Sequence, residues 1–158
     1  MTPALKLFIL DDMGLYYEDF KTGQTFVSRA RTVTEADIVM FAGLSWDLNP
    51  LHTDAEFASG SVFGERIAHG MLGLVISTGL SQSLNILDDT ILAFLGLNWK
   101  FVAPVKIGDT LHLEQSVGEM RETSKPDRGI VVFESKLINQ RGEKVQEGTR
   151  TVMVKRKS

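Results

Sequence analysis

The sequence predicts an α+β domain in which one long helix packs against a sheet of five or six antiparallel strands. The first observation is a stretch without charged residues from position 70 to position 87, which is long enough for a central helix. The second is a series of segments rich in β-forming residues in the second half of the chain, separated by short turns. Strands joined by short turns pair antiparallel, and one helix layered on such a sheet is an α+β arrangement.

The uncharged stretch opens at His69 and Gly70 and is interpreted as the central helix. Its length is close to that of a membrane-spanning helix. It contains three glycines and six polar side chains, which favour a helix in a protein core; the polar residues are Ser77, Thr78, Ser81, Gln82, Ser83 and Asn85. Because apolar and small residues fall on nearly every face, we expect this helix to be buried all round.

Five segments have the composition of β-strands. They are 24–33, 91–102, a segment around Leu111, Leu113 and Val117, 129–138, and 145–155. In the last of these, the clearest alternation runs through Val145, Thr149, Thr151 and Met153. The turn signals that separate the last four strands lie at 106–109, 125–129 and 140–143.

A shorter helix is expected between the first strand and the central helix. Its signal is a capping box followed by apolar residues at helical spacing, formed by Thr34 and Asp37 and then by Ile38, Phe41 and Ala42. We expect about three turns, with fraying at Gly43. One further helical turn is expected at 54–58.

Composition and charge exclude several classes of protein. The chain has 158 residues, 43% of them apolar and 23% charged, which is typical of one globular domain, 1–158, with an irregular segment at 1–22. Its net charge is −3 and it has no basic stripe, so neither a nucleic acid nor a membrane surface is an expected partner. It contains no cysteine, which excludes disulfides and a cysteine nucleophile and fits a cytoplasmic location.

The densest group of chemically useful side chains lies between Asp47 and Asp54. This segment has no helical or strand period and contains the turn dipeptide Asn-Pro at 49–50, so Asp47 and His52 are expected on a loop. A turn can bring the two side chains together, and such a pair can hold one water and move protons near neutral pH. An ordinary surface turn fits the same residues. A metal site that adds Asp54 and His69 is possible in principle, but no typical ligand spacing supports it, so no metal is expected.

His69 and Gly70 form a second candidate site. The start of a helix offers free backbone N–H groups and a positive dipole end, and Gly70 would let a ligand approach closely. An oxyanion that develops on a thioester carbonyl suits that position, although the glycine could equally relieve crowding. Thr78 is expected to donate a hydrogen bond to a backbone carbonyl, and Trp46 and Trp99 are expected to pack.

Three blocks of the sequence carry a family resemblance. The block at 41–54 reads FAGLSWDLNPLHTD, the block at 66–72 reads RIAHGML, and the third combines APV at 103–105 with IGD at 107–109. Together they resemble the MaoC-like family of (R)-specific enoyl-CoA hydratases and dehydratases. The first block is the most specific, and the resemblance extends over residues 17–155.

The resemblance implies a hot-dog fold, in which an antiparallel sheet wraps a long central helix and two subunits join their sheets. It implies that Asp47 and His52 are the catalytic pair, that Asn49 orients their loop, and that the Gly70 N–H is the oxyanion donor. The residues expected to contact the substrate are Thr78, Trp46 and His69. Trp46 departs from the family, whose members typically have a small residue before the aspartate, and its bulk could narrow the acyl pocket or move the loop.

The implied activity is the (R)-specific hydration of a 2-enoyl-CoA thioester, or the reverse dehydration of a 3-hydroxyacyl-CoA. An acyl-CoA is then the substrate, no cofactor is needed, and the protein is a homodimer or a higher homo-oligomer. A hot-dog thioesterase and a non-catalytic acyl-binding subunit are the alternatives. The Asp–Asn-Pro–His block favours hydration, because addition at the β-carbon needs both an acid and a base.

Overall fold

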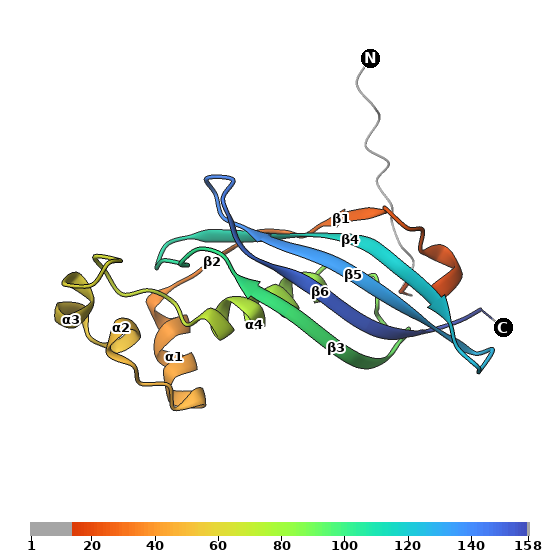
Figure 1. The fold of residues 1–158 in the computed structure, drawn as a ribbon, viewed down its shortest axis with the longest axis horizontal. Coiled ribbons are helices and arrows are strands. Elements are labelled where there is room, and N and C mark those ends of the chain that lie inside the picture. The colour runs from red at the N-terminus through yellow and green to blue at the C-terminus, as the bar shows by residue number, and fades with distance from the viewer. Residues whose placement is uncertain (1–13, 158) are drawn as a thin grey trace, which may run out of the picture.

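The computed structural model describes residues 14–157, which form one antiparallel sheet with a helix along one face (Figure 1). The fold is therefore α+β with a central helix, as the sequence predicts. Of the irregular segment expected at 1–22, residues 14–22 contain one 3-10 turn, η1 (Tyr17–Asp19), and residues 1–13 lie outside the described part.

The sheet has six strands, all paired antiparallel. They are β1 (Thr25–Val27), β2 (Arg31–Thr32), β3 (Ile91–Phe101), β4 (Thr110–Glu122), β5 (Arg128–Ile138) and β6 (Lys144–Lys155). The order across the sheet is β1-β4-β5-β6-β3, and β2 also pairs with β4. The long strand β3 therefore forms one edge of the sheet, and the short strands β1 and β2 lie at the other.

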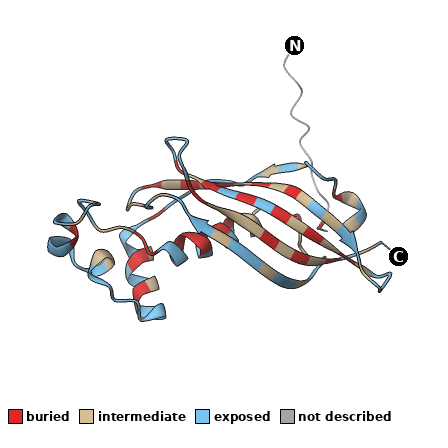
Figure 2. Ribbon diagram, in the orientation of Figure 1, coloured by how far each residue is buried: buried red, intermediate tan, exposed pale blue. Residues whose placement is uncertain are grey.

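The helices divide into one that packs on the sheet and three that lie beyond its end (Figure 1). The helix on the sheet is α4 (Gly70–Gln82), and the three others are α1 (Glu35–Ser45), α2 (Pro50–Thr53) and α3 (Ala55–Ser59). The core lies between α4 and the sheet, where Leu72, Ile76 and Leu80 pack with Leu111 and Leu113. Figure 2 shows buried bands across β4, β5 and β6, whereas β3 is exposed or half-buried along its length.

The strand predicted at 24–33 is split in two by a side chain. The Ser28 hydroxyl oxygen accepts the Leu113 N–H at 2.9 Å, while the Ser28 N–H donates to the Leu113 carbonyl at 2.9 Å. The Ser28 hydroxyl oxygen thus replaces a backbone carbonyl as the acceptor at this point of the pairing with β4. The regular pairing stops there, so β1 and β2 are separate strands on the same partner.

Strand β6 has the predicted position, but its buried side chains are not those of the predicted alternation. Arg150, Val152 and Val154 are buried, whereas Thr149, Thr151 and Met153 are half-buried. The alternation did not identify the inward side of β6, because a charged residue, Arg150, occupies an inward position. Only Val145 of the predicted set is fully buried.

The expectation that the central helix is buried all round is wrong for the single chain. Met71 and Val75 on α4 are 53% and 54% exposed, because the sheet covers only the opposite side of the helix. The helix also ends at Gln82, before the end of the uncharged stretch. Within residues 14–157, no helix combines the length and apolar character needed to cross a membrane.

Candidate active site

The end of α1 sets the position of Asp47. The helix begins at the predicted capping box, in which the Asp37 carboxylate accepts the Thr34 N–H at 2.8 Å and the Thr34 hydroxyl accepts the Asp37 N–H at 3.4 Å. It continues past Gly43, where fraying was expected, and is closed by Trp46 in the left-handed conformation, with φ of 62°. This residue reverses the chain direction, so Asp47 lies on the loop that follows.

His52 lies on the short helix α2 and not on the predicted loop. The Asn49 side chain caps this helix by accepting the Leu51 N–H at 3.0 Å, and Pro50 occupies its first turn, where proline is favoured. The Asn49 N–H also donates to the Asp47 carboxylate at 3.3 Å. Asn49 therefore contacts both Asp47 and the helix that carries His52.

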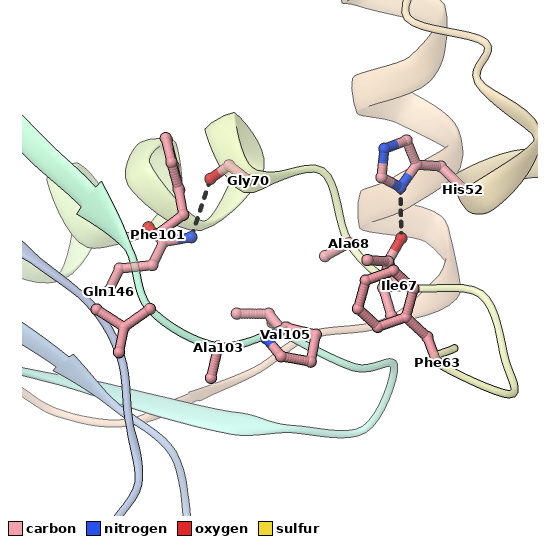
Figure 3. Close-up of a pocket in the computed structure, with 11 residues that line it drawn as sticks. His52, Phe63, Ile67, Ala68, Gly70, Phe101, Ala103, Val105 and Gln146 are labelled. Carbon is pink, nitrogen blue, oxygen red and sulfur yellow. Dashed lines mark hydrogen bonds between the residues drawn. The ribbon is translucent and has the colours of Figure 1, made fainter. Parts of the chain in front are cut away.

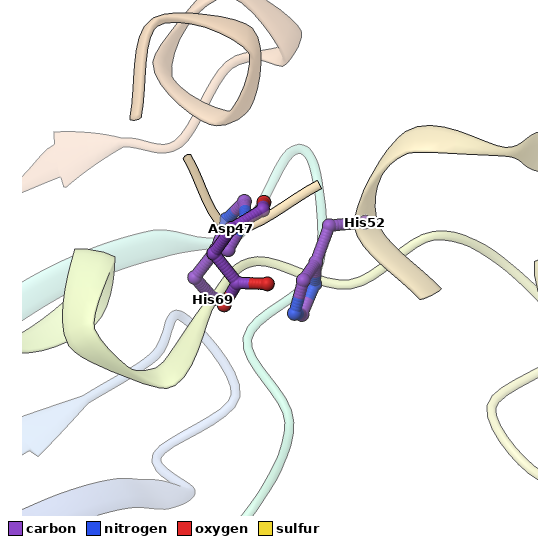
Figure 4. A group of neighbouring side chains, drawn as sticks. All are labelled: Asp47, His52 and His69. Carbon is purple, nitrogen blue, oxygen red and sulfur yellow. The ribbon is translucent and has the colours of Figure 1, made fainter. Parts of the chain in front are cut away.

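Asp47, His52 and His69 come together from three separate segments (Figure 4). The imidazole rings of His52 and His69 are stacked, with centroids 3.8 Å apart and planes tilted by 31°. One oxygen of Asp47 and one nitrogen of each ring lie within 4.8 Å of one another. His69 is only 2% exposed, whereas His52 is half-buried and Asp47 is exposed.

Backbone carbonyls fix the tautomers of the two histidines. His52 Nδ1 lies 2.7 Å from the Ile67 carbonyl oxygen, and His69 Nε2 lies 2.9 Å from the Asp47 carbonyl oxygen. A carbonyl oxygen only accepts, so each of these nitrogens carries a hydrogen. In the neutral rings the free lone pairs are therefore on His52 Nε2 and on His69 Nδ1, and the latter has no partner within residues 14–157.

The three side chains are a poor metal site despite their closeness. A metal lies in the plane of each imidazole that binds it, about 2 Å from the nitrogen. The planes of two rings stacked at 31° meet well away from either ring. The fourth candidate ligand, Asp54, caps α3 by accepting the Phe57 N–H at 3.0 Å. We therefore assign no metal to this cluster.

Gly70 and His52 line the same cavity, of about 280 Å³ (Figure 3). The Gly70 N–H makes no hydrogen bond within the described residues, since the backbone bonds of the helix start with Leu72 and Gly73 onto the His69 carbonyl. A Cβ at Gly70 would lie 3.0 Å from the Phe101 ring. The glycine thus relieves crowding against β3 and also leaves a free N–H at the positive end of α4.

None of the three residues expected to contact substrate, Thr78, Trp46 and His69, lines this cavity, and Asp47 does not line it either. The Thr78 hydroxyl donates to the Leu74 carbonyl at 3.2 Å, as expected, but Thr78 lies on the exposed side of α4. Trp46 is 85% exposed, so its indole neither packs nor narrows the cavity within the single chain. Trp99 does pack, with the Arg150 guanidinium 5.1 Å from its ring centre.

Of the residues that line the cavity, sequence reasoning singled out only His52 and Gly70; among those it missed are Phe63, Phe101 and Gln146. The two phenylalanines resemble any other apolar residue of a loop or strand. Gln146 is 2% exposed and points inward from β6. An uncharged amide within an apolar strand is a usable signal, but it requires the phase of the strand to be known.

The third sequence block fixes the loop that forms one wall of the cavity. Val105 lines the cavity, and Asp109 follows it in the turn before β4. The Asp109 carboxylate accepts the Lys106 N–H at 2.9 Å and side-chain bonds from Arg141 at 2.9 Å and Gln140 at 3.1 Å. Burial raises the pKa of Asp109, but these hydrogen bonds outweigh burial, and the pKa lies below its ordinary value.

Comparisons with known proteins agree with this geometry. The family model described as "MaoC like domain" matches residues 19–137. A protein of Rhodospirillum rubrum named (R)-specific enoyl-CoA hydratase is 40% identical over 146 residues, which cover 91% of this chain and 95% of the relative. The crystal structure of the MaoC-like dehydratase from Rhodospirillum rubrum, at 37% identity, superposes with a TM-score of 0.84 over 92% of this chain and 99% of its own.

The fold itself has a wider distribution. A Mycobacterium tuberculosis protein described as a double hotdog fold superposes with a TM-score of 0.77 at 22% identity, over 91% of this chain and 45% of its own. The sheet around a long helix is thus a hot-dog fold. The match to the family model and the identity over nearly the whole chain lead to one conclusion: this chain belongs to the MaoC-like dehydratase family.

Proposed function

We propose that this protein catalyses the (R)-specific hydration of a 2-enoyl-CoA thioester and the reverse dehydration of a 3-hydroxyacyl-CoA. The observation that carries the proposal is one cavity lined by both His52, whose Nε2 is left with a free lone pair, and Gly70, whose N–H makes no hydrogen bond within residues 14–157. The Asp47 carboxylate lies beside His52. The Rhodospirillum rubrum relative that carries this activity in its name supports the same reaction.

In the proposed reaction, the thioester carbonyl accepts the Gly70 N–H, and Asp47 and His52 hold one water beside the β-carbon. The water oxygen bonds to the β-carbon, its proton passes to the carboxylate–imidazole pair, and the π electrons move toward the carbonyl oxygen. The pair then delivers one proton to the α-carbon, so it ends with the protons it had. The Gly70 N–H contributes more to the transition state than to the bound substrate, because negative charge develops on the carbonyl oxygen as the water adds.

Hydrolysis by a thioesterase is the alternative reaction in the same cavity. It needs a water directed at the carbonyl carbon and a single base, whereas hydration needs a base for the water that adds to the β-carbon and an acid that protonates the α-carbon. The juxtaposition of a carboxylate with the free nitrogen of His52 therefore favours hydration. The products differ, since hydrolysis releases free CoA and hydration does not.

The test follows the loss of the conjugated enoyl-thioester absorbance of crotonyl-CoA, with a panel of longer and branched enoyl-CoAs if crotonyl-CoA is not used. We expect an (R)-3-hydroxyacyl-CoA product and a fall in kcat of roughly 10²–10⁴-fold in Asp47→Asn and in His52→Gln, because each removes a proton-transfer group. Asp54→Asn is the matched control. Asn also caps helices, so α3 and the activity should be preserved.

Release of free CoA, or silence of the wild-type protein across the whole panel, would overturn the hydratase proposal. Activity that survives Asp47→Asn at the level of Asp54→Asn would overturn the role given to Asp47.

The proposal includes a homodimer, because the single chain leaves one edge of its sheet open. Within residues 14–157, strand β3 pairs only with β6, and its exposed side chains include large apolar residues: Ile91, Leu92, Phe94, Leu95, Leu97 and Phe101. A long apolar edge is a site of association unless something covers it. A second copy that pairs at β3 would cover it. The proposal also keeps the acyl-CoA as the partner, without a cofactor, and the cytoplasmic location.

A further inference from the structure

Gln146 joins β6 to the first turn of α4 inside the protein. Its side-chain amide is 2% exposed. The amide nitrogen donates to the Gly70 carbonyl at 3.0 Å, and the amide oxygen accepts the Trp99 indole N–H at 2.9 Å (Figure 3 shows the first bond). Both polar ends of a buried side chain are therefore used. One of them reaches Gly70, which lines the cavity and whose N–H makes no hydrogen bond within residues 14–157.

The Gln146 amide occupies space that a side chain at Gly73 would fill. A Cβ at Gly73, one turn after Gly70, would lie 2.2 Å from the Gln146 amide nitrogen. Any side chain there would displace the amide. A second glycine, Gly148, leaves space for the Trp99 ring, since a Cβ there would lie 2.6 Å from it. The contact from β3 through Gln146 to Gly70 thus depends on two positions without side chains.

We propose that Gln146 is a positioning residue that holds the Gly70 N–H at the place where the thioester oxygen binds. An oxyanion donor contributes only when it is fixed before the charge develops. The free N–H at Gly70 belongs to the first turn of a helix, whose N–H groups lack partners within the helix. The bond from Gln146 ties that turn to β6, and the bond from Trp99 holds the amide in place. The inference rests on the proposed role of Gly70 and adds the residue that fixes it.

The matched pair of variants is Gln146→Leu and Gln115→Leu. Both remove a buried glutamine that lies between the sheet and α4, but Gln115 contacts the far end of the helix, where its amide oxygen accepts the Ser81 hydroxyl at 3.0 Å. A purely structural role for buried amides predicts similar effects of the two changes. A positioning role predicts that only Gln146→Leu affects the chemistry at Gly70.

We expect Gln146→Leu to lower kcat roughly 10–100-fold with KM nearly unchanged, because a donor displaced by about 1 Å loses much of its effect in the transition state. Gln115→Leu should leave both constants near the wild-type values. Butyryl-CoA is saturated and cannot be hydrated. When it is labelled with ¹³C at the thioester and bound, its infrared carbonyl band reports the hydrogen bond from the Gly70 N–H to the thioester oxygen. Its shift to lower frequency should be reduced in Gln146→Leu and preserved in Gln115→Leu.

A double-mutant cycle tests whether Gly73 affects the chemistry by leaving space for the Gln146 amide. Gly73→Ala should lower kcat as much as Gln146→Leu does, because the new methyl group displaces the amide. In a Gln146→Ala background the same Gly73→Ala change should have little further effect. Additive losses would show that Gly73→Ala acts in another way and would overturn the link.

The inference and the proposed function fail in different ways. If the wild-type protein hydrates no enoyl-CoA, the proposed function is wrong, and the positioning of Gly70 by Gln146 is then judged by the amide NMR signal of Gly70. That signal should shift in Gln146→Leu and stay in place in Gln115→Leu. An unshifted Gly70 signal, or an unchanged kcat and carbonyl band in an active Gln146→Leu enzyme, would overturn the positioning role of Gln146.

Discussion

Trp46 closes α1 in a conformation that suits glycine and not tryptophan. Its φ of 62° is left-handed, and its side chain is 85% exposed. A residue with a Cβ pays roughly 1–2 kcal/mol for this backbone region, and glycine does not. We expect Trp46→Gly to raise the free energy of unfolding by up to about 1 kcal/mol, after the greater freedom of glycine in the unfolded chain is subtracted. Urea unfolding of the two proteins at equal concentration measures the difference.

A loss of stability in Trp46→Gly would mean that the indole is covered in the assembled protein. Lower activity with improved stability would instead place the indole against the substrate, which is the contact that the sequence leads us to expect.

At the scale of single residues, the sequence predicts the part of the site that is local in the chain. Asp47 and His52 come together because an Asn-Pro turn separates them, and that turn is visible in the sequence. The stacking of His69 on His52 and the bond from Gln146 to Gly70 depend on contacts between distant segments. No periodicity carries that information, so these contacts could not be predicted.

Between α4 and β6, Arg150 is a buried charge without a carboxylate partner in the described part of the chain. It donates to the Ser77 carbonyl and hydroxyl, and burial lowers its pKa to about 10. That depression corresponds to a cost of roughly 3 kcal/mol for the charged form. We expect Arg150→Met to raise the free energy of unfolding at pH 7 by about 1–3 kcal/mol. The Ser77 hydroxyl keeps its own acceptor, the Leu74 carbonyl, in the variant.

The pH dependence of this difference gives the check. A cation with a lowered pKa in the folded state destabilises that state below the folded pKa, and the cost fades as the pH rises through about 10. The advantage of Arg150→Met in urea unfolding should therefore shrink between pH 9 and pH 11. Equal or lower stability of the variant at pH 7 would show that the guanidinium has a partner in the assembled protein.

Asp109 ties the turn before β4 to the turn between β5 and β6. Its pKa is lowered in the folded protein, so its charge adds stability above the ordinary value of 3.8, and this contribution is lost as the pH falls below that value. We expect Asp109→Asn to lower the free energy of unfolding by about 1–3 kcal/mol at pH 7 and by less at pH 3. Thermal unfolding at the two pH values measures this.

The control for this change is Asp127→Asn, at an exposed aspartate paired with its neighbour Arg128. A surface change of this kind should alter stability by at most about 0.5 kcal/mol. An Asp109→Asn protein with the same deficit at pH 3 as at pH 7 would contradict the electrostatic account.

The sequence predicts where the helices and strands lie more accurately than it predicts which of their side chains point inward. Four long strands and the central helix lie where composition and turn signals place them. The first strand breaks at Ser28 because a hydroxyl replaces a backbone acceptor, and the inward face of β6 was misread because Arg150 lies on it. Both wrong predictions arise where a polar side chain forms hydrogen bonds inside the protein. The pattern of apolar residues in the sequence does not identify such positions.

For the whole molecule, the two edges of the sheet differ in a way that predicts assembly. The β1 edge is three residues long, whereas the β3 edge is eleven residues long and carries large exposed apolar side chains. The exposed side of α4, with Met71 and Val75, adds a second apolar surface that the described part of the chain leaves uncovered. A second copy at β3 would bury such surfaces, and closed twofold pairing is the commonest form of assembly.

The substitution that tests this arrangement is Phe94→Lys, because a charged side chain on an edge strand opposes pairing with another chain. Phe94 is 57% exposed, so the change should cost the single chain little. We expect sedimentation to give about twice the chain mass of 17.5 kDa for the wild-type protein and a shift toward the single-chain mass for Phe94→Lys. Val27→Lys, at a 58% exposed position on the β1 edge, is the matched control and should remain a dimer.

If both variants dimerise as the wild-type protein does, the subunits do not join at β3, and the apolar edge must be covered by another surface of the molecule. If Phe94→Lys is monomeric and also inactive while Val27→Lys is neither, the single chain lacks part of the active site, since Phe94 itself does not line the cavity around His52 and Gly70.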